Sequence, residues 1–328
     1  MAFRLRPDRP FTAEFRSVAE NQLKKAIGFL ENQPDGPHEA IHDARKKFKR
    51  VRALYRLIEP DAKDFRRAEN ARLRDMAKTL SAVRDATALI ETVDYLTTEA
   101  GSEEEQAALA SASNALTKRR DRIAAEEHDL PAKMAAAADT CRAAIAALDG
   151  LELDDHHRRT AKRLGKVWEK QRRKAIAALS QCHDNTHAEA FHDLRKCGQV
   201  YWMHLSLLRD AWPSAMAAKQ RETKLLVDRL GHEHDLSVLT EIINESPDIF
   251  GSSETLALVI GAIITRQQAL RHEALDLAEK VFADSAERES DVIALLWLEA
   301  SRLSGKVHAE KPSDKHIQGQ EIALRGVS

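Results

Sequence analysis

The feature that most constrains the fold is a similarity between the two halves of the chain. Residues 42–46 read HDARK and residues 192–196 read HDLRK, an offset of 150 positions. Two further matches keep the same order at offsets of 149 and 150, namely QLKKAI (22–27) with QRRKAI (171–176) and LSAVRDATAL (80–89) with LGHEHDLSVL (230–239). Ordered matches at a nearly constant offset indicate an internal duplication. The repeat is too long for a solenoid unit, so we expect one domain-sized unit that occurs twice.

Periodic apolar residues predict helices in both units. In residues 38–58, for example, apolar side chains recur every three or four positions, which places them on one helix face. Only 12 Gly and 9 Pro interrupt the 328 residues, and no convincing alternating strand pattern appears. The predicted helices span residues 11–33, 38–58, 62–98, 103–128 and 132–148 in the first unit, and 155–182, 187–210, 214–246, 253–282 and 286–303 in the second.

Short connections between these helices favour antiparallel neighbours, so the sequence predicts an all-α protein of two antiparallel helical bundles. We expect the first unit to comprise residues 1–150 and the second residues 151–305, followed by a polar tail over residues 306–328. The longest apolar run, residues 256–264, is too short to span a bilayer, and the first residues do not resemble a signal peptide. Three cysteines, an odd number without framework spacing, favour reduced thiols and a cytoplasmic protein.

The helix predicted over residues 38–58 carries charge of a single sign. Seven lysines and arginines lie between positions 45 and 56, and no acidic residue follows Asp43 in that run. On a helical wheel, one basic stripe opposite the apolar face contains Arg45, Lys46, Lys49, Arg52 and Arg56. A second stripe, within residues 156–174, contains Arg159, Arg163, Lys166, Lys170 and Arg173.

The net charge of the chain is only −1, so its basic residues are segregated and not in excess. A solvated helix face usually alternates in sign, because like-charged pairs one turn apart cost roughly 0.2–0.5 kcal/mol each. Segregated cations are typical of a site for a polyanion. The alternative is that both stripes are solvated faces of a structural or partner-binding module.

The two stripes carry no aromatic side chain on which a base could stack, because Tyr55 and Trp168 fall on the apolar faces. The sequence also lacks zinc-finger spacing, an RNP-like aromatic segment and a glycine-rich phosphate loop. A chain of bare phosphates therefore suits these faces best, and non-specific nucleic-acid binding is the second interpretation.

His42 and His192 occupy equivalent positions in the two units. His38 and His42 have the spacing of a helical metal pair, but no HExxH motif or carboxylate partner accompanies them. Histidine-based metal binding is therefore an alternative, and we expect neither a metal nor another cofactor. We expect His42 and His192 to hydrogen-bond the backbone or, as cations, an anion. Since no catalytic arrangement has a recognisable context, we expect a binding protein and not an enzyme.

The duplicated helical unit, the H-x-x-[RK] helix start with basic residues every three to four positions, and the later L-x-x-x-RD motif together resemble the CHAD family, the conserved histidine α-helical domain. The resemblance extends over residues 10–303. It implies two helical bundles related by a pseudo-twofold axis that enclose a basic channel or surface, and binding of inorganic polyphosphate without catalysis. Association with polyphosphate granules in the cytoplasm would fit that function.

Carried over position by position, the resemblance assigns ligand-binding positions in both units. They are Lys24, Lys25, His42, Arg45, Lys46, Lys49, Arg52, Arg56 and Arg84 in the first unit, and Arg173, Lys174, His192, Arg195 and Lys196 in the second. The second unit departs from the pattern, because Gln199 and Trp202 stand where the first has Lys49 and Arg52, and His234 stands where it has Arg84. The second helix of this unit is therefore expected to make fewer contacts with the ligand, and the stripe at residues 159–174 is expected to supply cations in their place.

Overall fold

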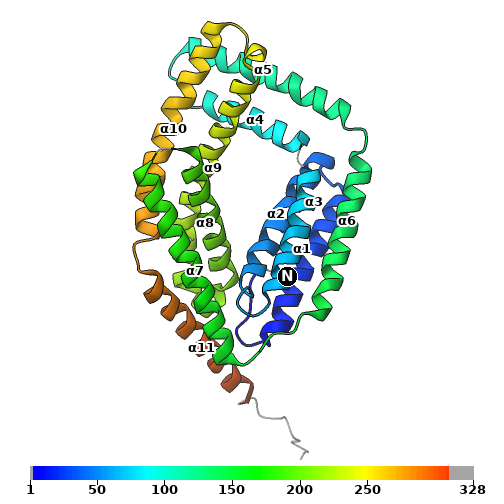
Figure 1. Cartoon of the computed structure of the whole chain (residues 1–328), viewed down its shortest axis with the longest axis vertical. Coiled ribbons are helices and arrows are strands. Elements are labelled where there is room, and N and C mark those ends of the chain that lie inside the picture. Colours follow the sequence, from blue (N-terminus) through cyan, green and yellow to red (C-terminus); the bar gives the residue numbers. More distant parts are fainter. Residues whose placement is uncertain (1–2, 81, 186, 310–328) are drawn as a thin grey trace, which may run out of the picture.

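The computed structural model describes residues 3–80, 82–185 and 187–309, and these fold almost entirely into α-helices (Figure 1). No strand occurs among them, so the prediction of an all-α protein is confirmed. The first half of the chain forms α1 (Phe11–Asn32), α2 (Pro37–Arg56), α3 (Lys63–Thr79), α4 (Ala82–Thr97), α5 (Glu103–Glu126) and α6 (Leu130–Ala147). The second half forms α7 (His157–Asp184), α8 (Ala188–Leu207), α9 (Pro213–Glu245), α10 (Ser253–Val281) and α11 (Ala286–Ala309). Short 3-10 helices, η1 (Leu148–Gly150), η2 (Arg209–Ala211) and η3 (Pro247–Phe250), follow α6, α8 and α9.

The single helix predicted over residues 62–98 is wrong, because the chain forms two helices there. α3 ends at Thr79, whose hydroxyl donates to the carbonyl oxygen of Met76 at 2.7 Å, and α4 begins at Ala82. The equivalent stretch of the second half stays one helix, α9, over 33 residues. The break allows α3 to pack on α2 and α6 while α4 packs on α5 and α9. No glycine or proline marks it, so the usual sequence signal for a helix end is missing.

The last helix also differs from the expectation, because α11 continues past the predicted end at residue 303 to Ala309. The tail predicted over residues 306–328 therefore begins within a helix, and its residues 310–328 lie outside the described residues.

Two columns of helices stand side by side in Figure 1, and further helices cross above them. One column contains α1, α2, α3 and α6, and the other contains α7, α8, α11 and parts of α9 and α10. α4 and α5 pack against the remaining parts of α9 and α10. The halves share an order of contacts, since α1 packs on α2 and α6 while α7 packs on α8 and α11. The duplication, its pseudo-twofold symmetry and the unit boundary at residue 150 stay predictions.

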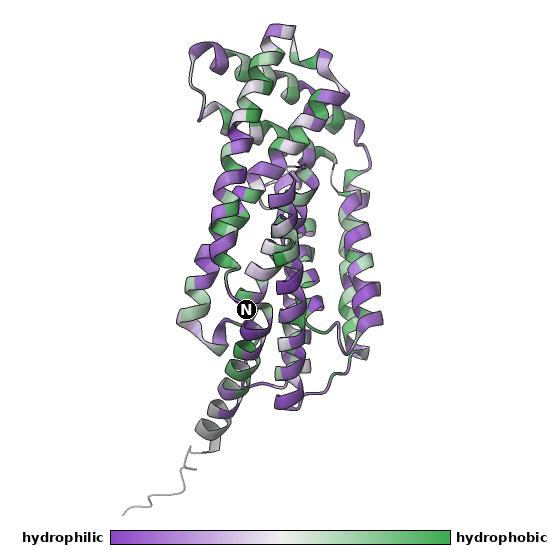
Figure 2. Cartoon of the chain, turned by 60° about the vertical axis from the view of Figure 1, so that its left-hand side comes forward, coloured by the Kyte–Doolittle hydropathy of each residue, from purple (hydrophilic) through white to green (hydrophobic). Residues whose placement is uncertain are grey.

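Two apolar cores hold these helices together. The larger contains buried side chains from both columns, such as Phe48 and Tyr55 of α2 and Trp168 of α7, and the smaller joins α4 and α5 to α9 and α10. Each large apolar side chain buried in this way contributes roughly 1.5–3 kcal/mol. Hydrophilic and hydrophobic residues alternate along most helices in Figure 2, as expected where one face of each helix packs into a core. Within the described chain, no helix combines the length and apolarity needed to cross a membrane.

Direct contacts between the halves hold α2 beside α8. The Nε2 atom of the buried His204 lies 3.0 Å from the carbonyl oxygen of Ala53, and the amide of Leu5 donates to the carbonyl of Leu207 at 2.8 Å. Burial lowers the pKa of His204 to about 4, so the ring is neutral and its proton lies on Nε2, facing the carbonyl. These contacts fix the distance between the polar faces of α2 and α8.

Candidate anion-binding site

The basic stripe of α2 faces α8 across a groove. The opposite face of α2 is buried, as its apolar periodicity predicts, through Ile41, Ala44, Phe48, Val51 and Tyr55. The groove has a volume of about 320 Å³, and its polar lining consists of Lys49, Arg52 and Arg56 from α2 with His192, Lys196 and Gln199 from α8. The structure thus brings predicted site residues from both halves of the chain into one groove.

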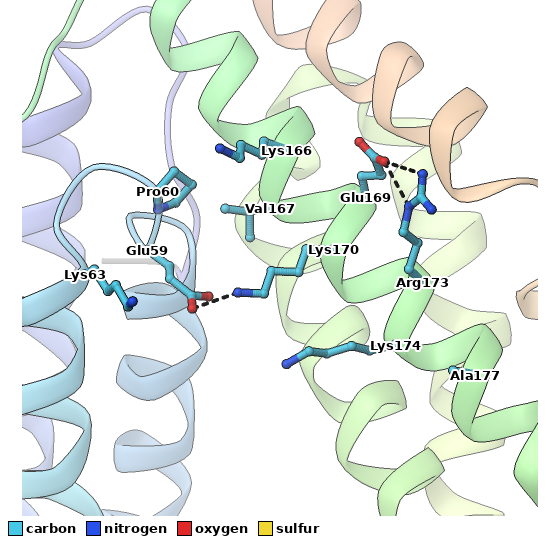
Figure 3. A pocket seen from close by; sticks show the side chains of 10 residues that line it. All are labelled: Glu59, Pro60, Lys63, Lys166, Val167, Glu169, Lys170, Arg173, Lys174 and Ala177. Carbon is cyan, nitrogen blue, oxygen red and sulfur yellow. Dashed lines mark hydrogen bonds and ion pairs between the residues drawn. The ribbon is translucent and has the colours of Figure 1, made fainter.

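Two further hollows extend this groove along α7. The nearer hollow, of about 370 Å³, shares Arg56 and Lys196 with the groove and adds Lys174. The farther hollow, of about 750 Å³, shares Lys174 and lies between α7 and the turn that joins α2 to α3 (Figure 3). We call the groove and the two hollows the basic track. Among the described residues, its lining contains nine cations (Lys49, Arg52, Arg56, Lys63, Lys166, Lys170, Arg173, Lys174 and Lys196) and three carboxylates (Glu59, Glu169 and Asp193).

Some cations of the track form ion pairs with acidic residues of their own helices. Lys196 donates to Asp193 at 2.8 Å, and at the equivalent position of α2 Lys46 donates to Asp43 at 3.0 Å. Arg173 donates through Nε to Glu169 at 2.9 Å. These pairs are exposed, where ion pairs contribute little to stability, so they orient the side chains without neutralising the track as a whole.

At the α2–α8 groove the track meets a cluster of charged residues and histidines from four helices. Arg84 of α4 donates through Nε to Nδ1 of His42 at 2.9 Å, and its terminal nitrogens contact both carboxylate oxygens of Glu91 at 3.1 and 2.9 Å. A terminal nitrogen of Arg45 lies 3.5 Å from Asp85. The RD motif at residues 84–85 therefore lies against α2, the helix that carries His42.

The surroundings of His42 favour its neutral form in the protein without ligand. Its Nδ1 atom accepts the hydrogen bond from Arg84, so its single proton lies on Nε2. Burial lowers its pKa below the ordinary value of 6.5, and the positive charges of Arg84 and Lys46 lower it further. His42 can therefore act toward an anion as a neutral N–H donor.

In the second half, His234 replaces Arg84 and a ring stack replaces the hydrogen bond. The rings of His192 and His234 lie 4.3 Å apart at an interplanar angle of 26°. Burial lowers the pKa of His234 to about 4, with Arg195 and His192 adding to the effect, and burial also lowers the pKa of His192. This side of the site therefore has fewer fixed charges than the side formed by α2 and α4.

Lys49 is the cation of the groove whose pKa changes most. Its side chain is exposed to solvent but stands in a concave wall opposite α8. Desolvation by the surrounding protein, together with the charges of Arg195 and Arg45 and against that of Asp235, lowers its pKa to about 8. The Nε atom of Arg195 is buried and has no hydrogen-bond partner within the described part of the chain. Crowded cations of this kind favour a bound anion.

A third basic wall, on α3, was missed by the sequence reasoning. Arg52 donates through Nε to Asn70 of α3 at 2.9 Å. Burial lowers the pKa of Arg56, and the nearby charge of Arg66 lowers it further. The Nε atom of Arg66 is itself buried and lacks a hydrogen-bond partner among the residues described. Basic residues do recur along α3 every three or four positions, but the acids between them, such as Glu69, make the helix look like an ordinary solvated one.

Four residues that the sequence predicts to bind the ligand lie outside the basic track. Arg163 is buried, pairs with Asp61 of the α2–α3 turn and lies over the ring of Phe11, so the prediction that it binds ligand is not supported. The cause is that the first turns of α7 are covered by the first half of the chain. The remaining three are exposed, namely Arg159, paired with Asp154 at 3.1 Å, Lys24, paired with Glu20 at 2.7 Å, and Lys25 on the same helix as Lys24.

The lining of the track has no Phe, Tyr or Trp side chain among the described residues, and its aromatic ring is that of His192, which stacks on His234. Tyr55 and Trp168 are 0% and 1% exposed, so both belong to the core, as predicted. In the same part of the chain, no group of three or more His, Cys, Asp and Glu side chains is arranged to hold a metal ion. The three cysteines are free.

Comparison with known protein families gives one match. A family model described as "CHAD domain" matches residues 17–244, more than two-thirds of the chain. The matched region begins within α1 and ends near the end of α9, so it contains both histidine helices and all the cations of the track. No match was found among curated proteins.

Proposed function

The chain belongs to the CHAD family, and from this premise we propose that it binds inorganic polyphosphate along the basic track without catalysing a reaction on it. The observation that carries the proposal is the track itself, in which cations from both halves of the chain line one continuous set of hollows and outnumber the carboxylates by nine to three among the described lining residues. A polyanion with a charge on every repeating unit matches this lining best.

The mechanism is charge neutralisation by side chains that are in place before the ligand arrives. Lys49, Arg52 and Arg56 lie about one helical turn apart, a rise of roughly 5 Å each, so successive phosphates of an extended chain can contact successive side chains. Arginine guanidinium groups bind phosphate oxygens through two parallel hydrogen bonds, whereas lysines act as point charges. Because α2 and α8 are fixed by the core, little ordering of the backbone opposes binding.

The absence of Phe, Tyr and Trp side chains from the described lining separates this proposal from nucleic-acid binding. Proteins that bind single strands without sequence preference combine a basic groove with aromatic residues on which bases stack, at roughly 1–3 kcal/mol per base. The track offers the phosphate contacts without the stacking surfaces, so we expect a nucleic acid to bind more weakly than polyphosphate.

Polyphosphate is expected to raise the melting temperature. A ligand at about 100 times its Kd stabilises the folded state by roughly 2.7 kcal/mol, which for a chain of this size corresponds to roughly 5 °C. Differential scanning fluorimetry with and without long-chain polyphosphate measures the shift. EDTA should leave the melting temperature unchanged, and a loss of stability on chelation would instead favour histidine-based metal binding.

Affinity for polyphosphate is expected to fall by up to about tenfold between pH 7 and pH 9, because Lys49 loses its charge over this range. Its pKa is lowered to about 8 in the free protein, so the side chain is mostly cationic at pH 7 and mostly neutral at pH 9. A Lys49→Arg variant keeps its charge throughout and should show a flatter profile. Equal pH profiles for the two proteins, measured by titration at constant ionic strength, would contradict a contact between Lys49 and the ligand.

A further inference from the structure

Glu59 places a carboxylate inside the farthest hollow of the basic track. It follows α2, in the turn that leads to α3, and its side chain is 17% exposed. Lys170 of α7 donates through Nζ to Glu59 at 2.9 Å. Figure 3 shows the two side chains pointing toward each other across the space between the halves of the chain, with Lys63, Lys166 and Lys174 around the same hollow.

The surroundings of Glu59 are strongly positive. Burial opposes its ionisation, but the hydrogen bond from Lys170 and the charges of Arg66 and Lys174 outweigh burial and lower the pKa of the carboxyl group. The other two carboxylates of the track pair along their own helices, Glu169 with Arg173 and Asp193 with Lys196. Glu59 differs because it belongs to the first half of the chain and takes its hydrogen bond from a lysine of the second half.

On the basis of the proposed function, we propose that this hollow is a phosphate subsite of the track, and that the Glu59 carboxylate occupies it until a phosphate group of the ligand displaces it. A carboxylate and a phosphate oxygen accept hydrogen bonds from the same donors, so both compete for Lys170. The Glu59 side chain extends from a turn, where its amide bonds to the carbonyl of Arg56 at 3.2 Å, and it can rotate away without moving α2 or α3. Glu59 thereby lowers the affinity of the track for a phosphate chain.

Removal of this charge should tighten binding. A Glu59→Gln variant keeps the size of the side chain, and we expect it to bind long-chain polyphosphate about two- to fivefold more tightly at low salt, the range that follows from the energies of exposed ion pairs. The matched control is Glu31→Gln, which removes an exposed carboxylate of α1 that pairs with Arg142 of α6 and does not line the track. Both variants change the net charge equally, so a general charge effect would appear in both.

The subsite itself is tested by two lysines one turn apart on α7. Both lysines line a neighbouring groove between α7 and α11, but only Lys166 also lines the hollow. Lys166→Gln should weaken binding about two- to fivefold and Lys162→Gln should not. Equal effects of these two variants would overturn the subsite, and unchanged or weaker binding by a folded Glu59→Gln variant would overturn the competition. With either of these outcomes, the proposed function still holds if the unmodified protein binds polyphosphate. If the unmodified protein does not bind polyphosphate, the proposed function itself is refuted.

Discussion

Replacing Lys49 and Arg52 together with glutamate is expected to reduce polyphosphate affinity at least about a hundredfold. Each charge-assisted contact to a phosphate contributes roughly 1.5–3 kcal/mol where it is well formed, and 2.7 kcal/mol corresponds to about a hundredfold in Kd. The variant loses two such contacts in the α2–α8 groove and gains two negative charges there. Titration with fluorescently labelled long-chain polyphosphate measures the change.

The control for this experiment is a matched charge reversal on α5. Lys118 and Arg122 are exposed, lie one turn apart and are far from the lining of the track, so Lys118→Glu with Arg122→Glu changes the net charge equally without touching the site. Its affinity should stay close to that of the unmodified protein. Circular dichroism and melting curves must show both variants folded. If the folded Lys49/Arg52 variant binds as well as the control, the stripe on α2 is a solvated face and the proposed function fails.

The contribution of α8 should be smaller than that of α2. Gln199 lines the same groove as Lys49 and Arg52, and a Gln199→Glu change should weaken binding only modestly because no cation is lost. Trp202, at the position equivalent to Arg52, packs against the larger core, so a substitution there would test folding and not binding.

Polyphosphate affinity is expected to fall steeply with salt concentration. For a flexible single strand, each neutralised phosphate contributes roughly −0.7 to the slope of log K against log salt. If six of the nine track cations engage phosphates, the slope is about −4, and a rise from about 50 to 200 mM salt lowers the affinity several hundredfold. The Lys49/Arg52 variant should show a slope smaller by about 1.4. A flat response in the unmodified protein would rule out charge neutralisation as the mechanism.

The helices and one wall of the site could be predicted from the sequence because both depend on local periodicity. Apolar residues every three to four positions mark the buried face of α2, and the cations between them mark the opposite face, with Lys49, Arg52 and Arg56 in the groove. The break between α3 and α4 left no such signal, since neither glycine nor proline marks it.

The remaining features depend on contacts between residues distant in the sequence. Arg163 has the same spacing as its neighbours in the stripe of α7, but its side chain is buried and pairs with Asp61, 102 positions away. The Nδ1 atom of His42 accepts a hydrogen bond because Arg84, 42 positions away, lies beside the ring. The basic wall on α3 is visible only once Arg66 is placed beside Arg56. In each case a partner from another helix determines the role of the side chain, and periodicity within one helix carries no information about that partner.

Competition between two polyanions tests the central claim most directly, since the claim is that the track is built for bare phosphates. Labelled single-stranded DNA is bound to the protein at low salt and displaced with long-chain polyphosphate, and the experiment is then repeated with labelled polyphosphate and unlabelled DNA, both at equal concentrations of phosphate groups. The lining of the described track has many cations and no Phe, Tyr or Trp residue, so polyphosphate should displace DNA readily and DNA should displace polyphosphate poorly. Efficient displacement of polyphosphate by DNA, with weak displacement in the opposite direction, would contradict the claim and assign the track to nucleic acid.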